Sequence, residues 1–460
     1  MQAYFTKDAD DARVLRLVRA DALEALGKEH PDVGRWIRQN GWRAAAGSVL
    51  VLPAAEGEIA GVLAGLGDES TLLRTVAAIA SSLPAGVYRL ADTPAGCESL
   101  CALGWALGQY RFTRYRSGEP ASEPCVLVWP EGVDQGRVID AAEADRLVRD
   151  LVNTPASDLG PAELEDASRT LAAEYQASVA VVEGDGLLTE GFPSIHAVGR
   201  ASSRAPRLID LRWGEPDRPR VTLVGKGVCF DTGGLDIKPA AGMRLMKKDM
   251  GGAAHVLGLA RMIMGADLPV SLRVLISAVE NSISGNAYRP GDVVETRKGL
   301  SVEIGNTDAE GRMVLCDALA LADEESPDLL IDMATLTGAA RVALGPELPA
   351  MFCDDEKTAV RLQALGMSLQ DPLWRLPFWD GYEGGLKSSV ADLNHISSDG
   401  FAGSIYGALF LRRFVDKAAA YIHIDVFSWN NAGRPGRAEG GETQSARALF
   451  ALIAERYPSG

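Results

Sequence analysis

Seven charged residues stand where apolar runs of the chain give way to glycine and other small residues. Their contexts are GKG, CFDTGG, DIKP, KKDMGG and NTDAEGR. Glycine and small residues let the backbone approach a ligand closely, so these segments are typical of a polar site rather than of a solvated face. The four carboxylates and three cations are Lys226, Asp231, Lys238, Asp249, Asp308, Glu310 and Arg312.

Four carboxylates gathered in one site need a strong positive counter-charge, because burying them unpaired would be prohibitive. Two divalent cations supply four positive charges, and carboxylate oxygens are suitable ligands for Zn²⁺, Mn²⁺ and Mg²⁺. Shared carboxylates hold such ions roughly 3.5–4 Å apart. The residues therefore predict a site for two metal ions.

Each segment also has a structural interpretation that the sequence leaves open. Asp249 could cap the helix expected directly after it. DAEGR could form a charged turn with an internal ion pair. GKG after a strand could belong to a phosphate loop, but the GxxxxGK[ST] spacing is absent and no GxGxxG occurs.

Histidine is scarce for a zinc enzyme, with five in the chain and no HExxH motif or paired-cysteine zinc pattern. We interpret His255, on the helix after Asp249, as a packing residue. His423 alternates with apolar neighbours in YIHIDV and is interpreted as a core residue with satisfied hydrogen bonds. Cys97 and Cys101 have no second pair and are interpreted as core residues. A metal site in this chain must therefore be rich in oxygen ligands.

The elements that position these residues are strands and helices in alternation. Apolar runs with few alternating polar residues predict strands buried on both faces, in a largely parallel or mixed sheet covered by helices. Ligands collect at the carboxyl ends of the strands in such folds. The runs are LIDLRW, VTLVGKG, VSLRVLISAV, DLLIDMATL and AYIHIDVFSW, with helices expected at GGAAHVLGLARMIMG and MVLCDALALADEE.

Two domains are expected. The first part of the chain alternates short apolar runs with helical patterns, which is typical of a small α/β unit. The helical stretch IDAAEADRLVRDLVN, followed by a turn with Pro, Ser and Gly, is expected to connect it to the rest. We predict an N-terminal α/β domain at 1–140 and a larger α/β domain at 141–460 with a central mixed sheet flanked by helices.

The acidic balance of the chain, 62 acidic against 46 basic residues with a net charge of −16, argues against general binding of nucleic acid or anionic membranes. No apolar run approaches the ~18 residues of a membrane span, and the N-terminal residues carry charges where a signal peptide needs apolar ones. Six cysteines without a repeating framework indicate reduced thiols. The sequence predicts a soluble, cytoplasmic protein.

The segments GKGVCFDTGGLDIKP, MKKDMGG, NTDAEGR and ATLTGA, in this order and spacing, closely resemble the leucyl (cytosol) aminopeptidase family of two-metal exopeptidases. The resemblance covers approximately residues 145–430. It implies a variable N-terminal α/β domain, a catalytic C-terminal α/β domain and a homohexamer whose active sites face an internal cavity. The implied activity is metal-dependent removal of the first residue from peptides with a free N-terminus.

The resemblance also implies a role for each site residue. Lys238 would polarise the scissile carbonyl, and Arg312 would hold a bicarbonate-like anion or a water as general base. Two Mn²⁺ or Zn²⁺ ions, with Mg²⁺ or Co²⁺ as alternatives, would be bound by Lys226, Asp231, Asp249, Asp308 and Glu310. Of these, Asp231 and Glu310 would bridge both ions. The substrate contacts would be Met246, Asn306, Thr335, Leu336 and Gly338.

One segment departs from the family pattern: from residue 424 the chain reads IDVFSWNNAGRPGRAEGGETQS. Because this segment helps to shape the pocket for the first side chain, a preference for leucine does not follow. Two other classes of function remain open. One is a non-catalytic hexameric scaffold or DNA-binding regulator of the same family. The other is a different two-metal hydrolase, such as a phosphatase, which the lack of an evident phosphate loop disfavours.

Overall fold

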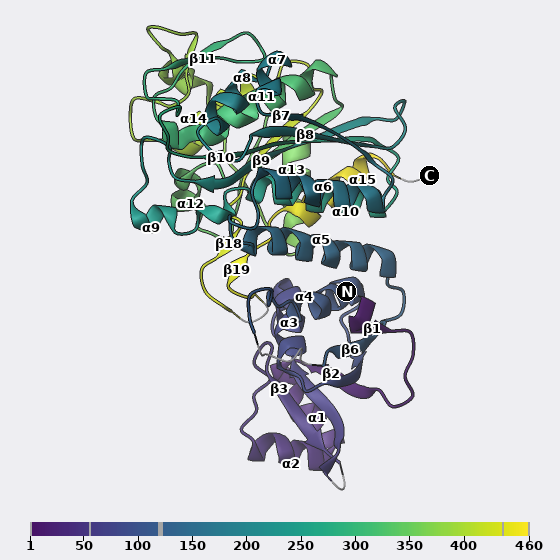
Figure 1. The fold of residues 1–460 in the computed structure, drawn as a ribbon. Helices are drawn as coiled ribbons and strands as arrows, with labels where there is room; N and C mark the ends of the chain where they lie inside the picture. The colour runs from purple at the N-terminus through teal and green to yellow at the C-terminus, as the bar shows by residue number, and fades with distance from the viewer. Residues whose placement is uncertain (1, 55–56, 118–122, 435–436, 459–460) are drawn as a thin grey trace. The chain divides into compact units, whose positions relative to one another are not determined.

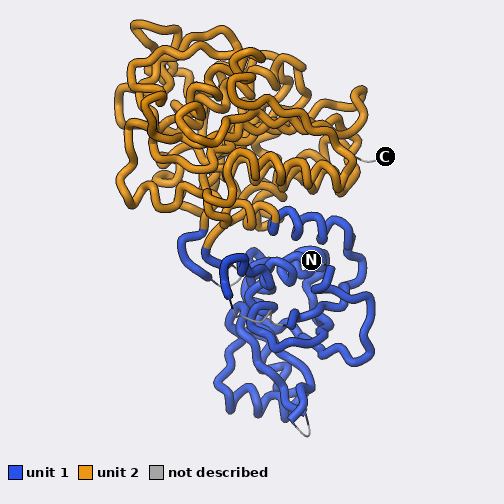
Figure 2. Tube along the Cα trace, viewed as in Figure 1, with its two compact units in different colours: residues 1–146, 430–439 blue, residues 147–429, 440–460 orange. Residues whose placement is uncertain are grey.

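The structure, a computed structural model, describes residues 2–54, 57–117, 123–434 and 437–458. The chain divides into two compact units, which Figure 2 shows in different colours. One consists of Met1–Arg146 with Asn430–Glu439, and the other of Leu147–Trp429 with Gly440–Gly460. A short segment from late in the sequence therefore belongs with the N-terminal unit.

The N-terminal unit is built on a six-stranded sheet in the order β1-β6-β5-β2-β4-β3. Neighbouring strands are parallel except β3 and β4, which are antiparallel. The strands are β1 (Phe5–Thr6), β2 (Arg13–Val18), β3 (Val49–Pro53), β4 (Ile59–Gly65), β5 (Gly86–Ala91) and β6 (Cys125–Val128).

Helices α1 (Leu23–Glu29), α2 (Pro31–Gln39), α3 (Leu72–Ser82) and α4 (Glu98–Gly108) accompany this sheet. Helices α3 and α4 approach each other closely, since a Cβ at Gly108 would lie 2.1 Å from the carbonyl oxygen of Ala77. Trp105 of α4 and Tyr88 of β5 are fully buried in the core of this unit. The long helix α5 (Gln135–Asn153) follows and runs across the division between the units.

The larger unit contains an eight-stranded mixed sheet in the order β15-β14-β17-β13-β9-β10-β8-β7. The pairs β13–β17, β13–β9, β9–β10 and β14–β15 are parallel, whereas β14–β17, β10–β8 and β7–β8 are antiparallel. The sheet is mixed, as the sequence predicts. Its strands are β7 (Ser178–Glu183), β8 (Arg207–Trp213), β9 (Arg220–Asp231), β10 (Ser271–Asn281), β13 (Leu329–Ala334), β14 (Ala350–Cys353), β15 (Trp374–Arg375) and β17 (Tyr421–Asp425).

Helices cover both faces of this sheet (Figure 1). One face carries α6 (Pro161–Glu174), α10 (Gly251–Gly265), α13 (Glu356–Ser368) and α15 (Ala446–Arg456). The other carries α7 (Gly186–Thr189), α8 (Pro193–Gly199), α11 (Glu310–Glu324) and α14 (Gly403–Arg412). Strands β9 and β10 are buried along almost their whole length, which explains their continuous apolar sequences.

The remaining elements are short. Strands β11 (Val293–Glu295), β12 (Ser301–Glu303) and β16 (Leu393–Asn394) form a small sheet, and β18 (Trp429–Asn430) pairs with β19 (Gly440–Gly441). Helices α9 (Ala240–Met243) and α12 (Gly338–Leu344) follow β9 and β13. Within the described residues, no helix is both long and apolar enough to cross a membrane.

Helix α10 lies directly on the central strands because glycines remove the side chains between them. A Cβ at Gly252 would lie 2.0 Å from the carbonyl oxygen of Met333 in β13. A Cβ at Gly225 in β9 would lie 2.7 Å from the Cα of Ala253 in α10. This close packing places the segment before α10 beside the ends of β9 and β13.

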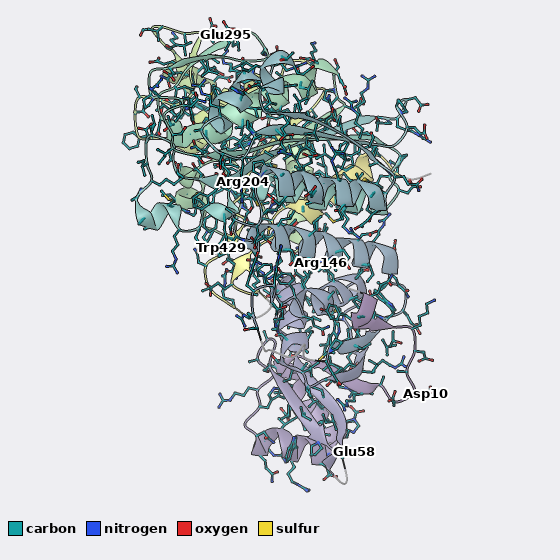
Figure 3. All side chains as sticks on the ribbon, viewed as in Figure 1. Asp10, Glu58, Arg146, Arg204, Glu295 and Trp429 are labelled. Atoms are coloured by element: carbon teal, nitrogen blue, oxygen red, sulfur yellow. The ribbon has the colours of Figure 1, made fainter. Side chains whose placement is uncertain are left out.

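Arg204, which is labelled in Figure 3, anchors the loop that precedes α6. Its guanidinium donates to the carbonyl oxygens of Ala156 and Ser157 and pairs with Glu280 in β10. The chain after α5 is therefore tied to the central sheet of the larger unit.

Candidate metal centre

A cavity of about 340 Å³ opens at the carboxyl ends of β9 and β13. Its lining includes all five predicted metal ligands, together with Lys238 and four of the five predicted substrate contacts: Met246, Thr335, Leu336 and Gly338. The fifth predicted contact, Asn306, and the predicted catalytic Arg312 are not among the lining residues.

Four separate elements bring the charged side chains together. Lys226 and Asp231 lie on β9, and Asp249 ends the short 3-10 helix η5 (Met246–Lys248) directly before α10. Asp308 lies in the 3-10 helix η6 (Thr307–Ala309), and Glu310 is the first residue of α11. Asp231, Asp308 and Glu310 each offer an oxygen within 4.8 Å of the others.

Two lysines hold the two ends of this carboxylate cluster. The Nζ atom of Lys226 lies 2.7 Å from Asp249 Oδ2 and 2.8 Å from Glu310 Oε1. The Nζ atom of Lys238 lies 2.7 Å from Asp231 Oδ2 and 2.6 Å from Asp308 Oδ1. Each lysine is therefore shared by two carboxylates, and the four carboxylates face only two positive charges.

Burial and the crowding of negative charge both shift the pKa values in the cluster. Burial, followed by the negative charge of Asp231, raises the pKa of Glu310 to about 8. Burial and Asp249 likewise raise the pKa of Asp231. Burial alone would lower the pKa of Lys226, but Asp249 and Glu310 outweigh it and raise that pKa.

The donor set fits divalent cations. Glu310 is almost fully buried, and its Oε2 atom has no hydrogen-bond partner among the described residues. A buried carboxylate oxygen left unpaired is costly, and hard oxygen ligands with one lysine amine suit Mn²⁺, Mg²⁺ or Zn²⁺. The cluster can therefore accept positive charge beyond what the two lysines supply.

Asp249 does not serve as a helix cap. The residue that caps α10 is Met250, which makes no side-chain hydrogen bond to the helix. The Asp249 carboxylate instead accepts from Lys226 and, at 2.8 Å, from the hydroxyl of Thr335. The capping interpretation of the sequence is thus wrong, because the carboxylate points into the cavity rather than at the helix end.

Hydrogen bonds that the sequence analysis missed hold the NTDAEGR segment in place. The amide of Asn281 donates to Asp231 Oδ1 at 2.8 Å and to the carbonyl oxygen of Thr307 at 3.0 Å. The hydroxyl of Tyr288 donates to the same carbonyl at 2.7 Å, and the carboxylate of Asp236 accepts from the backbone N–H of Thr307. Asn281 ends β10, where it is the register partner of Asp231 in β9.

Asn306 and Arg312 flank the cluster from outside the cavity lining. The side chain of Asn306 accepts the backbone N–H of Asp308 at 2.8 Å and so caps η6. Arg312 is buried in the first turn of α11 and donates to the carbonyl oxygen of His395. Among the described residues it forms no ion pair with Asp308 or Glu310, so the DAEGR turn is not closed internally.

His395 is a further residue that the sequence analysis missed. Its Nδ1 atom accepts the N–H of Gly305, so its Nε2 atom carries the proton and donates to the carbonyl oxygen of Asn306 at 3.0 Å. Burial and the nearby Arg312 lower the pKa of His395 to about 3. The imidazole is therefore a neutral support between Arg312 and the NTDAEGR segment.

Asp425, at the end of β17, fixes the loop after β13. Its carboxylate accepts from the backbone N–H groups of Leu336 and Thr337 at 2.9 and 3.2 Å and from the hydroxyl of Thr337 at 2.6 Å. Burial raises the pKa of Asp425. The loop that carries Thr335, Leu336 and Gly338 is thereby held at the cavity wall.

The two histidines interpreted as core residues are both fully buried. His255 lies 2.6 Å from the carbonyl oxygen of Gly251 through Nδ1, and its Nε2 accepts the N–H of Gln444, as expected of a packing residue. His423 differs, because its Nδ1 pairs with Asp332 at 2.7 Å while its Nε2 has no hydrogen-bond partner among the described residues.

The chain matches the models of two known domain families. Residues 146–450 match the model of the cytosol aminopeptidase family, catalytic domain, and residues 14–128 match the M17 aminopeptidase N-terminal domain. A probable cytosol aminopeptidase of Syntrophotalea carbinolica is 40% identical over 385 residues, which cover 79% of this chain and 77% of that protein.

Solved structures are similar to almost the whole chain. The cytosol aminopeptidase of Coxiella burnetii has a TM-score of 0.95 at 46% identity, covering 99% of this chain and 100% of the other. The bottromycin maturation enzyme BotP in complex with Mn has a TM-score of 0.88 at 35% identity, covering 97% of this chain and 100% of the other.

Fold and site together define a two-domain hydrolase of the peptidase class, with a mixed α/β architecture. The chain belongs to the cytosol aminopeptidase family, which confirms the resemblance read from the sequence. It is a metal-dependent aminopeptidase, and the scaffold or DNA-binding alternative is not favoured.

Proposed function

We propose that the chain hydrolyses the first residue from peptides with a free N-terminus, using a site for two divalent metal ions. The observation that carries the proposal is the cluster of four carboxylates, of which Asp231, Asp249 and Glu310 are buried, that share only two lysines. When bound, the ions would lower the pKa of a water molecule toward neutrality and polarise the scissile carbonyl. The ligands would be Lys226, Asp231, Asp249, Asp308 and Glu310.

The position of each ligand suggests which of the two ions it would bind. Glu310 pairs with Lys226 and Asp231 pairs with Lys238, and these two carboxylates offer oxygen atoms within 4.8 Å of each other, which would suit ligands shared by two ions. Lys226 and Asp249 would bind at one end and Asp308 at the other. Lys226 can be a ligand only as the neutral amine, a form that a neighbouring dication favours by lowering the lysine pKa.

Lys238 and Arg312 are the proposed catalytic cations. The ammonium of Lys238 lines the cavity beside Asp231 and Asp308, where it can donate to the oxyanion that develops on the carbonyl. Arg312 donates one hydrogen bond to His395, and a guanidinium carries five N–H donors. We assign its remaining donors to a bicarbonate-like anion or a water that takes up the proton.

The remaining assignments follow from the family and are part of the same proposal. Substrate contacts would be made by Met246, Asn306, Thr335, Leu336 and Gly338, of which all but Asn306 line the cavity. The ions would be Mn²⁺ or Zn²⁺, and the manganese complex of BotP supports the first. We propose a cytoplasmic homohexamer, in which residues 1–140 form an N-terminal domain and residues 141–460 the catalytic domain.

The test compares matched peptides that differ only at the N-terminus. Leu-Gly and Met-Gly should lose their first residue, whereas the N-acetylated forms should not, because acetylation removes the basic amine that anchors the substrate. Chelation should abolish the activity, and Mn²⁺ or Zn²⁺ should restore it. Comparable rates on free and acetylated peptides would overturn the aminopeptidase mechanism, and hydrolysis of phosphate esters alone would favour a phosphatase.

A further inference from the structure

Two cations that line the cavity lack the carboxylate partners that Lys226 and Lys238 have. Among the described residues, the side chains of Lys248 and Arg341 form neither an ion pair nor a hydrogen bond. Instead, both lie against one aromatic ring. The Nζ atom of Lys248 is 4.8 Å, and the Cζ atom of Arg341 is 4.9 Å, from the centre of the Phe427 ring. We call these three residues the cationic wall.

An unpaired ammonium in a buried position needs an explanation. Only 5% of Lys248 is exposed, and a buried charge without a hydrogen-bonded partner is strongly unfavourable. A cation–π contact compensates for part of this cost. It leaves the N–H donors of Lys248 and Arg341 free for a ligand, and both residues line the cavity that the substrate must enter.

The carboxylates of the cavity are engaged elsewhere. Four of them form the proposed metal centre, where two dications would balance their charge. The fifth, Asp425, is held by two backbone N–H groups and a hydroxyl of the loop after β13. With both ions bound, the part of the cavity bordered by the cationic wall would therefore be electropositive, since no described carboxylate pairs directly with Lys248 or Arg341.

The position of the cationic wall indicates which part of a substrate it meets. Lys248 directly precedes the proposed ligand Asp249, and Phe427 follows Asp425 by two residues. A Cβ placed on Gly338, a proposed substrate contact, would lie 3.9 Å from Nη2 of Arg341. The wall thus lies beside the segments that would hold the first residue of the peptide.

We propose that the cationic wall binds the side-chain carboxylate of an acidic first residue, so that peptides beginning with Glu or Asp are preferred substrates. This inference rests on the proposed aminopeptidase function and adds a substrate class to it. The ring of Phe427 would pack against the methylene groups of the side chain, while Lys248 and Arg341 donate to its carboxylate. Charge-assisted hydrogen bonds of this kind discriminate strongly against a neutral analogue.

The test uses Glu- and Gln-p-nitroanilide, which have nearly the same shape and differ in charge. Neither has a C-terminal carboxylate, so any effect arises from the first side chain. With the Mn²⁺-loaded chain, kcat/KM for the Glu substrate should exceed that for the Gln substrate by about tenfold or more. Arg341→Met and Lys248→Met should each lower this ratio, and the double variant should bring it near one.

Matched control variants separate this effect from a general change in charge. Lys357 on α13 and Arg218 are exposed and do not line the cavity. Lys357→Met and Arg218→Met should leave the Glu/Gln ratio as in the unchanged chain. Because Arg341 is exposed on α12, its substitution does not depend on repacking a core.

The outcomes that overturn the proposal are distinct from those that overturn the proposed function. A Gln substrate cleaved as well as the Glu substrate, or a ratio unaffected by both wall variants, would contradict the acidic preference. Leu-Gly and Leu-Gly amide differ only in the C-terminal carboxylate. If the wall variants cleave Leu-Gly less well relative to Leu-Gly amide than the unchanged chain does, the wall binds the C-terminal carboxylate instead.

A binding measurement tests the inference without turnover. In calorimetric titrations of the Mn²⁺-loaded chain, free L-glutamate should bind more tightly than L-glutamine, and Arg341→Met should remove the difference. Equal affinities would overturn the acidic preference. If no aminoacyl substrate is cleaved but glutamate still binds selectively, the aminopeptidase function fails while the cationic wall is supported.

Discussion

Lys238 differs from the other cluster lysine in its exposure and therefore in the chemistry open to it. Its side chain is 14% exposed, against 3% for Lys226, and it reaches the cavity from the segment after β9. Burial would lower its pKa, but Asp231 and Asp308 outweigh this and raise it. Lys238 is therefore a cation that can turn from its carboxylates toward a developing negative charge.

Lys238→Ala should lower kcat by about 10²-fold, the usual scale for the loss of one donor to an oxyanion. Metal content should stay unchanged, because the proposed ligands all remain. Steady-state kinetics and elemental analysis of the purified variant measure the two effects. A normal kcat would remove Lys238 from the catalytic role, and loss of metal would make its role structural. The exposed Lys357→Ala serves as control.

Asn281 shows why part of the site escapes sequence reasoning. The charged residues were predictable because strand ends followed by glycine and acidic residues have a recognisable pattern. Asn281 pairs in register with Asp231 across β10 and β9, but a neutral amide at a strand end is common and carries no such signal. Its function depends on two partners, Asp231 and Thr307, that only the folded sheet brings near it.

Asn281→Ala should weaken metal binding by about 10–100-fold, the usual effect of removing a residue that orients a metal ligand. The substitution removes one donor to Asp231 and one of the two side-chain donors to the carbonyl oxygen of Thr307, which keeps the hydroxyl of Tyr288. Competition with a coloured chelator measures the affinity directly. The exposed Asn286→Ala, five residues along the chain, should bind metal normally. Equal affinities for the two variants would contradict the positioning role.

At the scale of elements, the central strands were predictable and their order in the sheet was not. The apolar runs and the helix at 251–265 correspond to β8, β9, β10, β13, β17 and α10, because buried parallel strands and helices leave strong patterns. Strand order depends on pairings between distant segments, such as β14 inserted antiparallel beside β17. Local sequence carries no record of such pairings.

A buried ion pair joins the neighbouring strands β13 and β17. The sequence analysis, which considered each strand separately, did not predict it. Asp332 and His423 are register partners, and the second oxygen of Asp332 accepts the hydroxyl of Tyr421 at 2.7 Å. Burial alone would lower the pKa of His423, but Asp332 outweighs it and raises that pKa above its usual value. The folded state therefore binds the imidazole proton more tightly than the unfolded state does.

Asp332→Asn should destabilise the chain by about 2 kcal/mol at about pH 6, on the scale of a hydrogen bond to a charged group. Because the folded pKa of His423 is raised, this contribution is full below the unfolded value of about 6.5 and is lost as pH rises through the folded value. Urea unfolding should show that the free energies of unfolding of the unchanged chain and of Asp332→Asn differ less at about pH 9 than at about pH 6. A difference that grows with pH would contradict the ion pair between Asp332 and His423. The exposed Asp217→Asn serves as control and should unfold with the same free energy as the unchanged chain at both pH values.

At the scale of the whole molecule, the fold class was predictable from the sequence. That residues 430–439 belong to the same compact unit as the N-terminal residues was not. That segment begins within the stretch that departs from the family pattern, so no motif indicates where it lies. The acidic net charge of −16 acts at this scale as well, since self-repulsion opposes the compact state. The carboxylate cluster concentrates part of that repulsion inside the larger unit.

Removal of metal should therefore lower the stability of the whole chain, and not its activity alone. Ions that bind only the folded state stabilise it by RT ln(1 + [L]/Kd), or about 4 kcal/mol when the free metal is 1,000 times Kd. Scanning calorimetry should give a lower Tm in EDTA than in excess Mn²⁺. Glu310→Ala should show a smaller difference between the two conditions, because it lacks a ligand that would be shared by both ions, whereas the exposed Glu324→Ala on the same helix should respond like the unchanged chain. An identical Tm with and without metal would mean that the buried carboxylates are already balanced by Lys226 and Lys238, and the two-ion site would then have to be abandoned.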